Sequence, residues 1–184
     1  MARILLLGAD GQVGWELRRS LLPLGEVVGL TRKNCDLADK DKLVDAVRNL
    51  HPDIIVNAAA YTAVDKAEQE VTTAQCINAD TPATLAMEAR RLDALLVDYS
   101  TDYVFDGTKD GPYVETDATS PANVYGRTKL SGQHAIERSG CRYLIFRVSW
   151  VYASRGSNFL RTMLHLGQQR EELRVVSDQV GSPT

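Results

Sequence analysis

The sequence has few of the features that mark secreted, membrane-embedded or nucleic-acid-binding proteins. Its three cysteines (Cys35, Cys76 and Cys141) are an odd number without CxxC spacing. This favours reduced, mostly buried thiols in a cytosolic protein over a disulfide framework. A net charge of -3 without blocks of like charge indicates neither a nucleic-acid-binding surface nor a membrane-surface patch. The first apolar run, Ile4–Leu7, is too short for a signal peptide or a membrane span and predicts a buried strand.

What the sequence does contain is a regular alternation of short apolar runs and longer helical stretches. The runs predict buried strands at Ile4–Leu7, Val27–Leu30, Ile54–Val56, Leu95–Val97, Tyr143–Val148 and Leu173–Val176. The stretches between them predict helices at Val13–Leu22, Asp39–Leu50, Thr72–Arg91, Val124–Arg138 and Asn158–Gln169. This order predicts an α/β protein with a doubly wound parallel sheet of the Rossmann type. The 184 residues suit one domain, and no repeat or linker divides them.

Two hydroxyl-proline pairs predict the starts of helices. Thr81-Pro82 and Ser120-Pro121 each offer a capping hydroxyl followed by proline at a tolerated first-turn position. Because the first pair falls inside Thr72–Arg91, we expect that stretch to be broken or to form two helices. The last residues, 177–184, predict a loop that leads to further structure.

A glycine-rich turn follows the first predicted strand. Gly8, Gly11 and Gly14 are spaced GxxGxxG, between a strand and an amphipathic helix. Glycines at such a turn let a pyrophosphate approach the backbone and let the helix pack closely on the strand. The turn therefore predicts a dinucleotide site, although an ordinary strand-helix turn with a chance third glycine is the alternative.

The residues after the second predicted strand indicate which dinucleotide binds. An acid there would favour NAD, whereas this chain has Thr31-Arg32-Lys33, whose cations could pair with a 2′-phosphate. NADPH is therefore the expected cofactor and NADH the alternative; two exposed basic residues on a loop are also common without any ligand. Asp36 could bond the adenine amino group or cap the helix near Asp39, and the sequence does not separate these roles.

Polar and small residues follow two central strands, where open α/β sheets bind their ligands. Asn57-Ala58-Ala59-Ala60 would let a cofactor lie against the backbone, or would simply permit close packing. Ser100-Thr101 could hydrogen-bond a substrate carbonyl; an Asp/Gly turn is the alternative.

Tyr125 and Lys129 are the strongest catalytic candidates. Residues four apart share a helix face, and an ammonium there can lower the pKa of a phenol and make it a usable proton donor. No other tyrosine in the chain has a lysine four residues later. A surface pair on an amphipathic helix is the alternative, but the pair also follows the hydroxyl-bearing strand and the glycine turn.

Together these motifs resemble the short-chain dehydrogenase/reductase superfamily, extended type, and more narrowly the dTDP-4-dehydrorhamnose reductase family. The resemblance covers essentially all of residues 1–184. The Tyr/Lys motif belongs to the whole superfamily, whereas the segments STDYVF and NAAAYTAVD are much narrower. The stretches that carry it are Gly8–Glu16, Pro52–Glu68, Ser100–Gly107, Glu115–Leu130, Phe146–Tyr152 and Asp178–Thr184.

The resemblance implies a role for each matching residue. Tyr125 would donate the proton, Lys129 would tune its pKa and anchor the nicotinamide ribose, and Thr101 would help to polarise the carbonyl. Asp102 and Trp150 would contact the sugar, although a large aromatic residue such as Trp150 could equally be core. The cofactor would contact the glycine turn, the adenine side and the channel: Gly8, Gly11, Gln12, Val13, Gly14, Arg32, Asp36, Leu37, Ala60, Tyr61 and Thr62.

The implied reaction is NAD(P)H-dependent reduction of the C4 ketone of dTDP-4-dehydro-L-rhamnose to dTDP-L-rhamnose, in the cytoplasm. The implied partners are a dTDP-sugar and a second copy of the chain, with no nucleic acid, membrane or metal. Members of this family continue into a smaller C-terminal substrate lobe, so we expect residues 1–184 to be truncated, to bind the cofactor and to turn the sugar over poorly.

Alternatives are a regulatory subunit like that of methionine adenosyltransferase, and a sugar-nucleotide epimerase or dehydratase. Retention of Thr101, Tyr125 and Lys129 disfavours the regulatory role, and Tyr103 after Asp102 disfavours the dehydratase.

Overall fold

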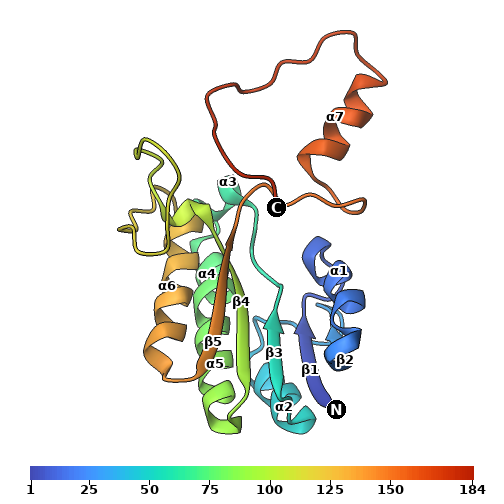
Figure 1. The fold of residues 1–184 in the computed structure, drawn as a ribbon, viewed down its shortest axis with the longest axis vertical. Coiled ribbons are helices and arrows are strands. Elements are labelled where there is room, and N and C mark those ends of the chain that lie inside the picture. Colours follow the sequence, from blue (N-terminus) through green and yellow to red (C-terminus); the bar gives the residue numbers. More distant parts are fainter.

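A computed structural model describes all of residues 1–184 and contains one five-stranded parallel sheet (Figure 1). The strand order is β2-β1-β3-β4-β5, and every neighbouring pair is parallel. The predicted doubly wound α/β fold is confirmed. The strands are β1 (Ala2–Leu7), β2 (Gly25–Leu30), β3 (Ile54–Asn57), β4 (Leu95–Thr101) and β5 (Arg142–Val148).

Helices connect the strands, and most of them pack against one face of the sheet. The main helices are α1 (Gln12–Ser20), α2 (Lys40–Leu50), α5 (Thr81–Leu92), α6 (Val124–Ser139) and α7 (Phe159–Gly167). Shorter helical segments are η1 (Leu22–Leu24), α3 (Val64–Ala67), α4 (Val71–Gln75), η2 (Cys76–Asp80) and η3 (Asp102–Val104). None of these helices combines the length and apolar composition needed to cross a membrane.

The apolar core explains why β1 is hydrophobic throughout. Leu5 and Leu7 point into the main core cluster, which α2, α5 and α6 complete. Ile4 and Leu6 point to the opposite face, where Leu17 of α1 packs against them. Because successive strand residues face opposite sides, a strand covered on both faces must be apolar at every position.

The carboxyl ends of the strands form the edge where a ligand is expected. The chain leaves β1 toward β2 on one side and continues with β3 on the other side, so the strand order reverses between β1 and β3. In open α/β sheets, ligands bind in the crevice at such a reversal. The glycine turn after β1, Ala58–Ala60 after β3 and Thr101 at the end of β4 all lie at this edge.

Residues 72–91 contain two α-helices, one of the two forms expected, but the chain between them is not broken. The helix continues from α4 into α5 through the π-helical segment η2. Neither predicted hydroxyl cap is formed. The Thr81 hydroxyl instead donates to the Leu37 and Cys76 carbonyl oxygens, and α6 begins later than Ser120-Pro121, with the Asn123 side chain accepting from the Gly126 N–H at 2.8 Å.

Residues 149–184, the C-terminal arm, differ from the rest of the chain. The arm extends beyond the carboxyl edge of the sheet and carries α7, and its last residues return to the end of β5 (Figure 1). The predicted strand Leu173–Val176 is wrong: this run is irregular, and Val175 and Val176 are exposed. A strand needs a hydrogen-bonded neighbour, and this run pairs with none because the sheet ends at β5.

Candidate active site

The turn after β1 brings the three predicted glycines together at the start of α1. Gly8 has a φ of +71°, and a Cβ there would lie 2.9 Å from the Ala59 backbone. A Cβ at Gly14 would lie 2.0 Å from the Gly8 carbonyl oxygen, so α1 packs on the turn at a distance that requires glycine. The Gly11 N–H donates to the Gly8 carbonyl at 3.0 Å. The turn thus presents the free N–H groups of the α1 N-terminus, a favourable place for an anion.

Gln12 begins α1, but its side chain is already engaged. Its Nε2 donates to the Ser157 carbonyl oxygen at 3.0 Å, and its Oε1 accepts from Asn158 Nδ2 at 2.8 Å. A pyrophosphate on this turn would therefore meet the backbone N–H groups of Gln12 and Val13 rather than the Gln12 amide.

The carboxyl end of β4 places a hydroxyl, a carboxylate and two phenols side by side. The Thr101 hydroxyl donates to Asp102 Oδ1 at 3.1 Å and accepts from the Tyr103 N–H at 3.2 Å. The Tyr103 and Tyr125 rings meet edge to face, with centroids 5.5 Å apart. Asp102 also accepts from the Ser149 hydroxyl at 2.6 Å. Residues from β4, α6 and the start of the C-terminal arm thus meet at the predicted catalytic position.

The Tyr125 side chain is partly buried. Burial raises the pKa of its phenol, hydrogen bonding with the Thr101 hydroxyl lowers it, and the Asp102 carboxylate and Tyr103 raise it. Lys129 is not among the groups that shift the Tyr125 pKa in this structure. The expected effect of the Lys129 ammonium on the phenol therefore stays a prediction.

Lys129 instead faces a carboxylate that the sequence reasoning missed. Its Nζ lies 3.8 Å from Asp98 Oδ2, and both side chains are almost completely buried. Asp98 Oδ1 accepts from Asn57 Nδ2 at 2.6 Å. Burial raises the pKa of the Asp98 carboxyl, whereas Lys129 and Asn57 lower it. Strand β4 begins with three apolar residues, and Asp98 follows them. Because a carboxylate in a buried strand is rarely left unpaired, Asp98 could have predicted a buried cationic partner.

Asn78 on η2 is a second residue that the sequence reasoning missed. Its Oδ1 accepts from the Tyr61 N–H at 2.9 Å, and its Nδ2 donates to the Tyr61 carbonyl at 3.1 Å and to Thr128 Oγ1 at 3.2 Å. The Tyr61 hydroxyl donates to Glu70 Oε2 at 2.8 Å. These bonds fix the loop of Ala60 and Thr62, the predicted cofactor channel, against α6. Asn78, which makes these bonds, lies in the π-helical segment η2, and π-helical turns are frequent at functional sites.

Trp150, predicted to contact the sugar, lies on the C-terminal arm beside the final residues. It has a φ of +42°, an unusual value for a non-glycine residue. The Tyr152 N–H donates to the Thr184 carbonyl at 3.2 Å, and a Cβ at Gly181 would lie 2.6 Å from the Trp150 indole. The exposed indole therefore packs against Gly181 at the same edge of the sheet as Asp102.

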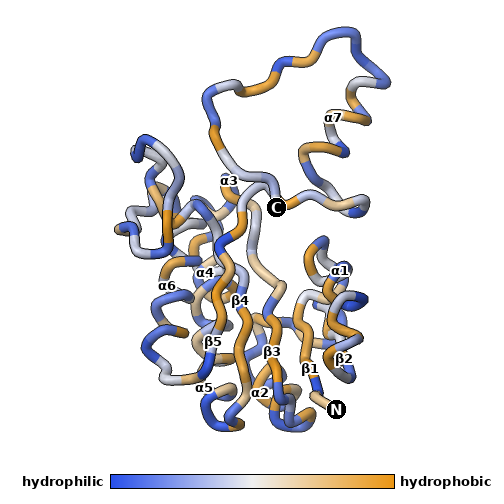
Figure 2. Tube along the Cα trace, viewed as in Figure 1, coloured by the Kyte–Doolittle hydropathy of each residue, from blue (hydrophilic) through white to orange (hydrophobic).

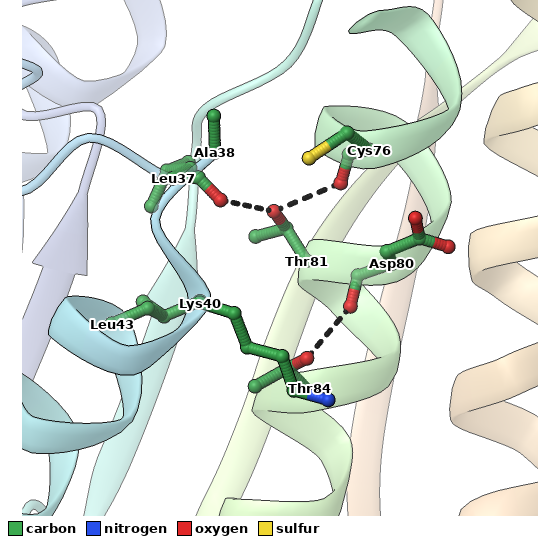
Figure 3. Close-up of a pocket in the computed structure, with 8 residues that line it drawn as sticks. All are labelled: Leu37, Ala38, Lys40, Leu43, Cys76, Asp80, Thr81 and Thr84. Atoms are coloured by element: carbon green, nitrogen blue, oxygen red, sulfur yellow. Dashed lines mark hydrogen bonds between the residues drawn. The ribbon is translucent and has the colours of Figure 1, made fainter. Parts of the chain in front are cut away.

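The residues predicted to meet adenine lie on the loop after β2. Arg32 Nε is 3.9 Å from Asp36 Oδ2, and both side chains are substantially exposed. Asp39, not Asp36, caps α2 by accepting from the Lys42 N–H at 3.1 Å. Leu37 lines a pocket of about 30 Å³ between this loop and η2 (Figure 3). A space of that size holds about one water molecule, so adenine would have to lie outside it.

The chain matches one protein family along nearly its whole length. The profile of the RmlD substrate binding domain family matches residues 2–184. The chain belongs to this family. It is 53% identical over 182 residues to dTDP-4-dehydrorhamnose reductase of Burkholderia thailandensis and 51% identical over 185 residues to that of Escherichia coli K12. These matches cover 99% and 98% of this chain, but 61% and 62% of the two relatives.

Solved structures give the same result. A crystal structure of dTDP-4-dehydrorhamnose reductase from Bacillus anthracis in complex with NADP superposes with a TM-score of 0.95 at 38% identity. It covers 100% of this chain, which spans 66% of that protein. The family membership and the fold predicted from the motifs are therefore confirmed. The chain contains no cluster of three or more His, Cys, Asp or Glu side chains that could hold a metal ion.

Proposed function

We propose that the chain carries the cofactor site and catalytic groups of a reductase that converts dTDP-4-dehydro-L-rhamnose to dTDP-L-rhamnose with NADPH. The observation that carries this proposal is the meeting of Thr101 and the partly buried Tyr125 at the carboxyl end of β4, at the same edge of the sheet as the glycine turn. Relatives that are about 50% identical to this chain are named dTDP-4-dehydrorhamnose reductase, and that name supports the proposed substrate.

The residues at the crevice fit a dinucleotide. Glycine is required at Gly8 and Gly14 by close backbone contacts, and the same absence of side chains lets a diphosphate approach the α1 N-terminus. Arg32 is exposed on the loop after β2 and forms only a long ion pair with Asp36. Its guanidinium could exchange that ion pair for one with a 2′-phosphate. This arrangement supports NADPH, and the NADP complex of the Bacillus anthracis relative agrees with it.

The reaction adds a hydride to the C4 carbonyl carbon and a proton to its oxygen. The nicotinamide cofactor, when bound, supplies the hydride. Tyr125 donates the proton as the oxygen gains negative charge, and the phenolate is then reprotonated from solvent. The Thr101 hydroxyl, which donates to Asp102 Oδ1 at 3.1 Å in this structure, would turn its single hydrogen toward the same oxygen when the substrate is bound. Lys129 favours the phenolate through its positive charge.

A first prediction tests this assignment through Tyr125→Phe, which removes only the phenolic oxygen. Proton transfer by a positioned acid contributes about 10²–10⁴-fold, so turnover should fall by that factor while NADPH affinity changes little. NADPH oxidation with dTDP-4-dehydro-L-rhamnose is followed under single-turnover conditions, which make a slow reaction measurable. Tyr143→Phe, which alters an exposed phenol on β5, is the matched control.

Three results separate the candidate functions. Absence of NADPH binding by the chain would reject the cofactor site, and an unchanged rate in Tyr125→Phe would reject the catalytic assignment. Tight NADPH binding without any turnover of the sugar, measured in a longer chain that also carries the part of the relatives' length beyond residues 1–184, would instead favour a regulatory subunit. The cytoplasmic location and a homodimer stay predictions from the sequence.

A further inference from the structure

A buried polar chain runs beneath the floor of the crevice and ends at Lys129. Asn57 and Asp98 are directly opposite each other in the β3–β4 register, which places their side chains on the same face of the sheet. Asn57 Nδ2 donates to Asp98 Oδ1 at 2.6 Å, and Asp98 Oδ2 lies 3.8 Å from Lys129 Nζ. At the other end, Asn57 Oδ1 accepts from the Ala59 N–H at 3.3 Å. The chain of contacts therefore joins the backbone beside Gly8 to α6.

The burial of this ion pair makes its charge state consequential. The exposed fraction is 2% for Asp98 and 3% for Lys129. A lysine buried without a counter-charge loses its proton readily, because desolvation disfavours the ammonium by up to 3–5 pKa units. Asp98 and Lys129 form an ion pair with each other and with no other residue. Each buried charge is therefore compensated by the other alone.

We propose that Asp98 is a positioning residue that holds Lys129 as a charged ammonium beneath the active site. The Asn57 amide donates a hydrogen bond to Asp98 Oδ1 and so favours the deprotonated carboxylate. This bond also orients Asp98 Oδ2 toward Lys129 on α6. Asp98 touches neither the substrate nor the reacting atoms, and it acts through Lys129. This role rests on the proposed function, in which Lys129 must be cationic to favour the Tyr125 phenolate.

The groups that could substitute for Asp98 are occupied or lie elsewhere. Glu68 accepts from the Val124 N–H at 2.7 Å, and Asp102 accepts from Thr101 and Ser149. Other titratable groups lie on the first turns of α6 or on the segments next to them. They are Tyr125, Tyr103, Asp102, Glu68, Cys76 and Asp80. Of the carboxylates, only Asp98 forms an ion pair with Lys129.

The second prediction concerns Asp98→Asn, which removes the charge and keeps the shape. We expect Lys129 to lose its proton at a lower pH than in the parent protein, because burial disfavours an ammonium that has no counter-ion. The measurement is NMR of the 184-residue protein with ¹³C/¹⁵N-labelled lysine, titrated from neutral to alkaline pH, with the Lys129 signal assigned from Lys129→Met. Asp45→Asn, the same chemical change at an exposed site on α2, is the control and should leave Lys129 unchanged.

Two results would overturn the proposal: a neutral Lys129 in the parent protein at pH 7, or an unchanged Lys129 titration in Asp98→Asn. If Asp98→Asn folds too weakly for NMR, the double variant Asp98→Asn/Lys129→Met provides the test. Removal of both charges should restore part of the urea midpoint lost in the single variant, because the lone buried ammonium is what destabilises it. A double variant no more stable than the single one contradicts the proposal. NADPH binding is measured on the same samples, so failure of the cofactor site is seen separately from the charge state of Lys129.

Discussion

The sheet with its covering helices, residues 1–148, and the C-terminal arm use similar amino acids in opposite ways. Leu85 of α5 and Leu96 of β4 are fully buried, whereas Phe159, Leu160 and Leu164 of α7 are 65%, 48% and 62% exposed. Figure 2 shows the same hydrophobic colouring on α7 as on the buried strands. In the whole arm only Asn158, a polar residue, is buried.

The difference shows that an amphipathic pattern determines a helix but not its burial. The apolar side chains of α5 and α6 lie on a sheet face that strands β1, β3 and β4 present to them. No sheet face lies beneath α7, so its apolar stripe has nothing to pack against. Hydrophobic stabilisation scales with the apolar area removed from water, and the arm should therefore contribute little to the stability of the rest of the chain.

The third prediction compares the same substitution in the two regions. Leu96→Ala removes a fully buried side chain and should lower the free energy of unfolding by about 4 kcal/mol, since it leaves a cavity between the sheet and α5. Leu164→Ala, at 62% exposure on α7, should change it by less than about 0.5 kcal/mol. Urea unfolding followed by circular dichroism measures both. Equal losses would mean that α7 packs on the sheet in solution.

The fourth prediction compares two glycines that both lie against other atoms. A Cβ at Gly14 would meet the Gly8 carbonyl oxygen at 2.0 Å, and backbone there cannot move without displacing α1 from the turn. We expect Gly14→Ala to cost about 2–3 kcal/mol and to abolish NADPH binding. A Cβ at Gly181 would meet the Trp150 indole at 2.6 Å, but that side chain is exposed and can rotate away. Gly181→Ala should therefore cost less than about 1 kcal/mol, and a larger loss would show that the indole is fixed.

The two regions also differ in how well the sequence predicted them. All five strands of the sheet and helices α1, α2 and α6 were predicted to within a few residues, because continuous apolar runs and 3.6-residue periodicity report burial directly. Helix α7 was predicted equally well. The run Leu173–Val176 has the same composition as a buried strand, yet pairing depends on a partner that local sequence does not specify.

The candidate site was predicted unevenly for a similar physical reason. Gly8, Thr101 and Tyr125 belong to motifs with a known spacing, and the fold brings them to one edge. Asn78 and Asp98 belong to no local motif, since their partners Tyr61 and Lys129 are 17 and 31 residues away in the sequence. The π-helical turn that aims Asn78 has no clear sequence signature. Contacts of this kind depend on strand register and helix packing, which the periodicity of a single chain does not give.

The contact between the two regions is expected to have only a small effect on overall stability. Gln12, at the start of α1, exchanges two hydrogen bonds with Ser157 and Asn158, and the Arg155 guanidinium lies 3.5 Å from the centre of the Trp15 ring. This contact holds the arm over the N-terminus of α1, where the proposed diphosphate would bind. The fifth prediction is that Gln12→Ala costs only about 1 kcal/mol in overall stability, because these hydrogen bonds are exchanged for bonds to water.

The same variant should have a clear local effect. Amide hydrogen exchange in α7 should become faster, since few buried contacts other than this one hold the arm, while exchange in β1 and β4 stays unchanged. Gln69→Ala, at an exposed glutamine on the loop after α3, is the control. Faster exchange in the strands as well would mean that the arm and the sheet unfold as one unit. In that case α7 stabilises the glycine turn through Gln12, although its own side chains are exposed. The two regions would then differ in burial but not in stability.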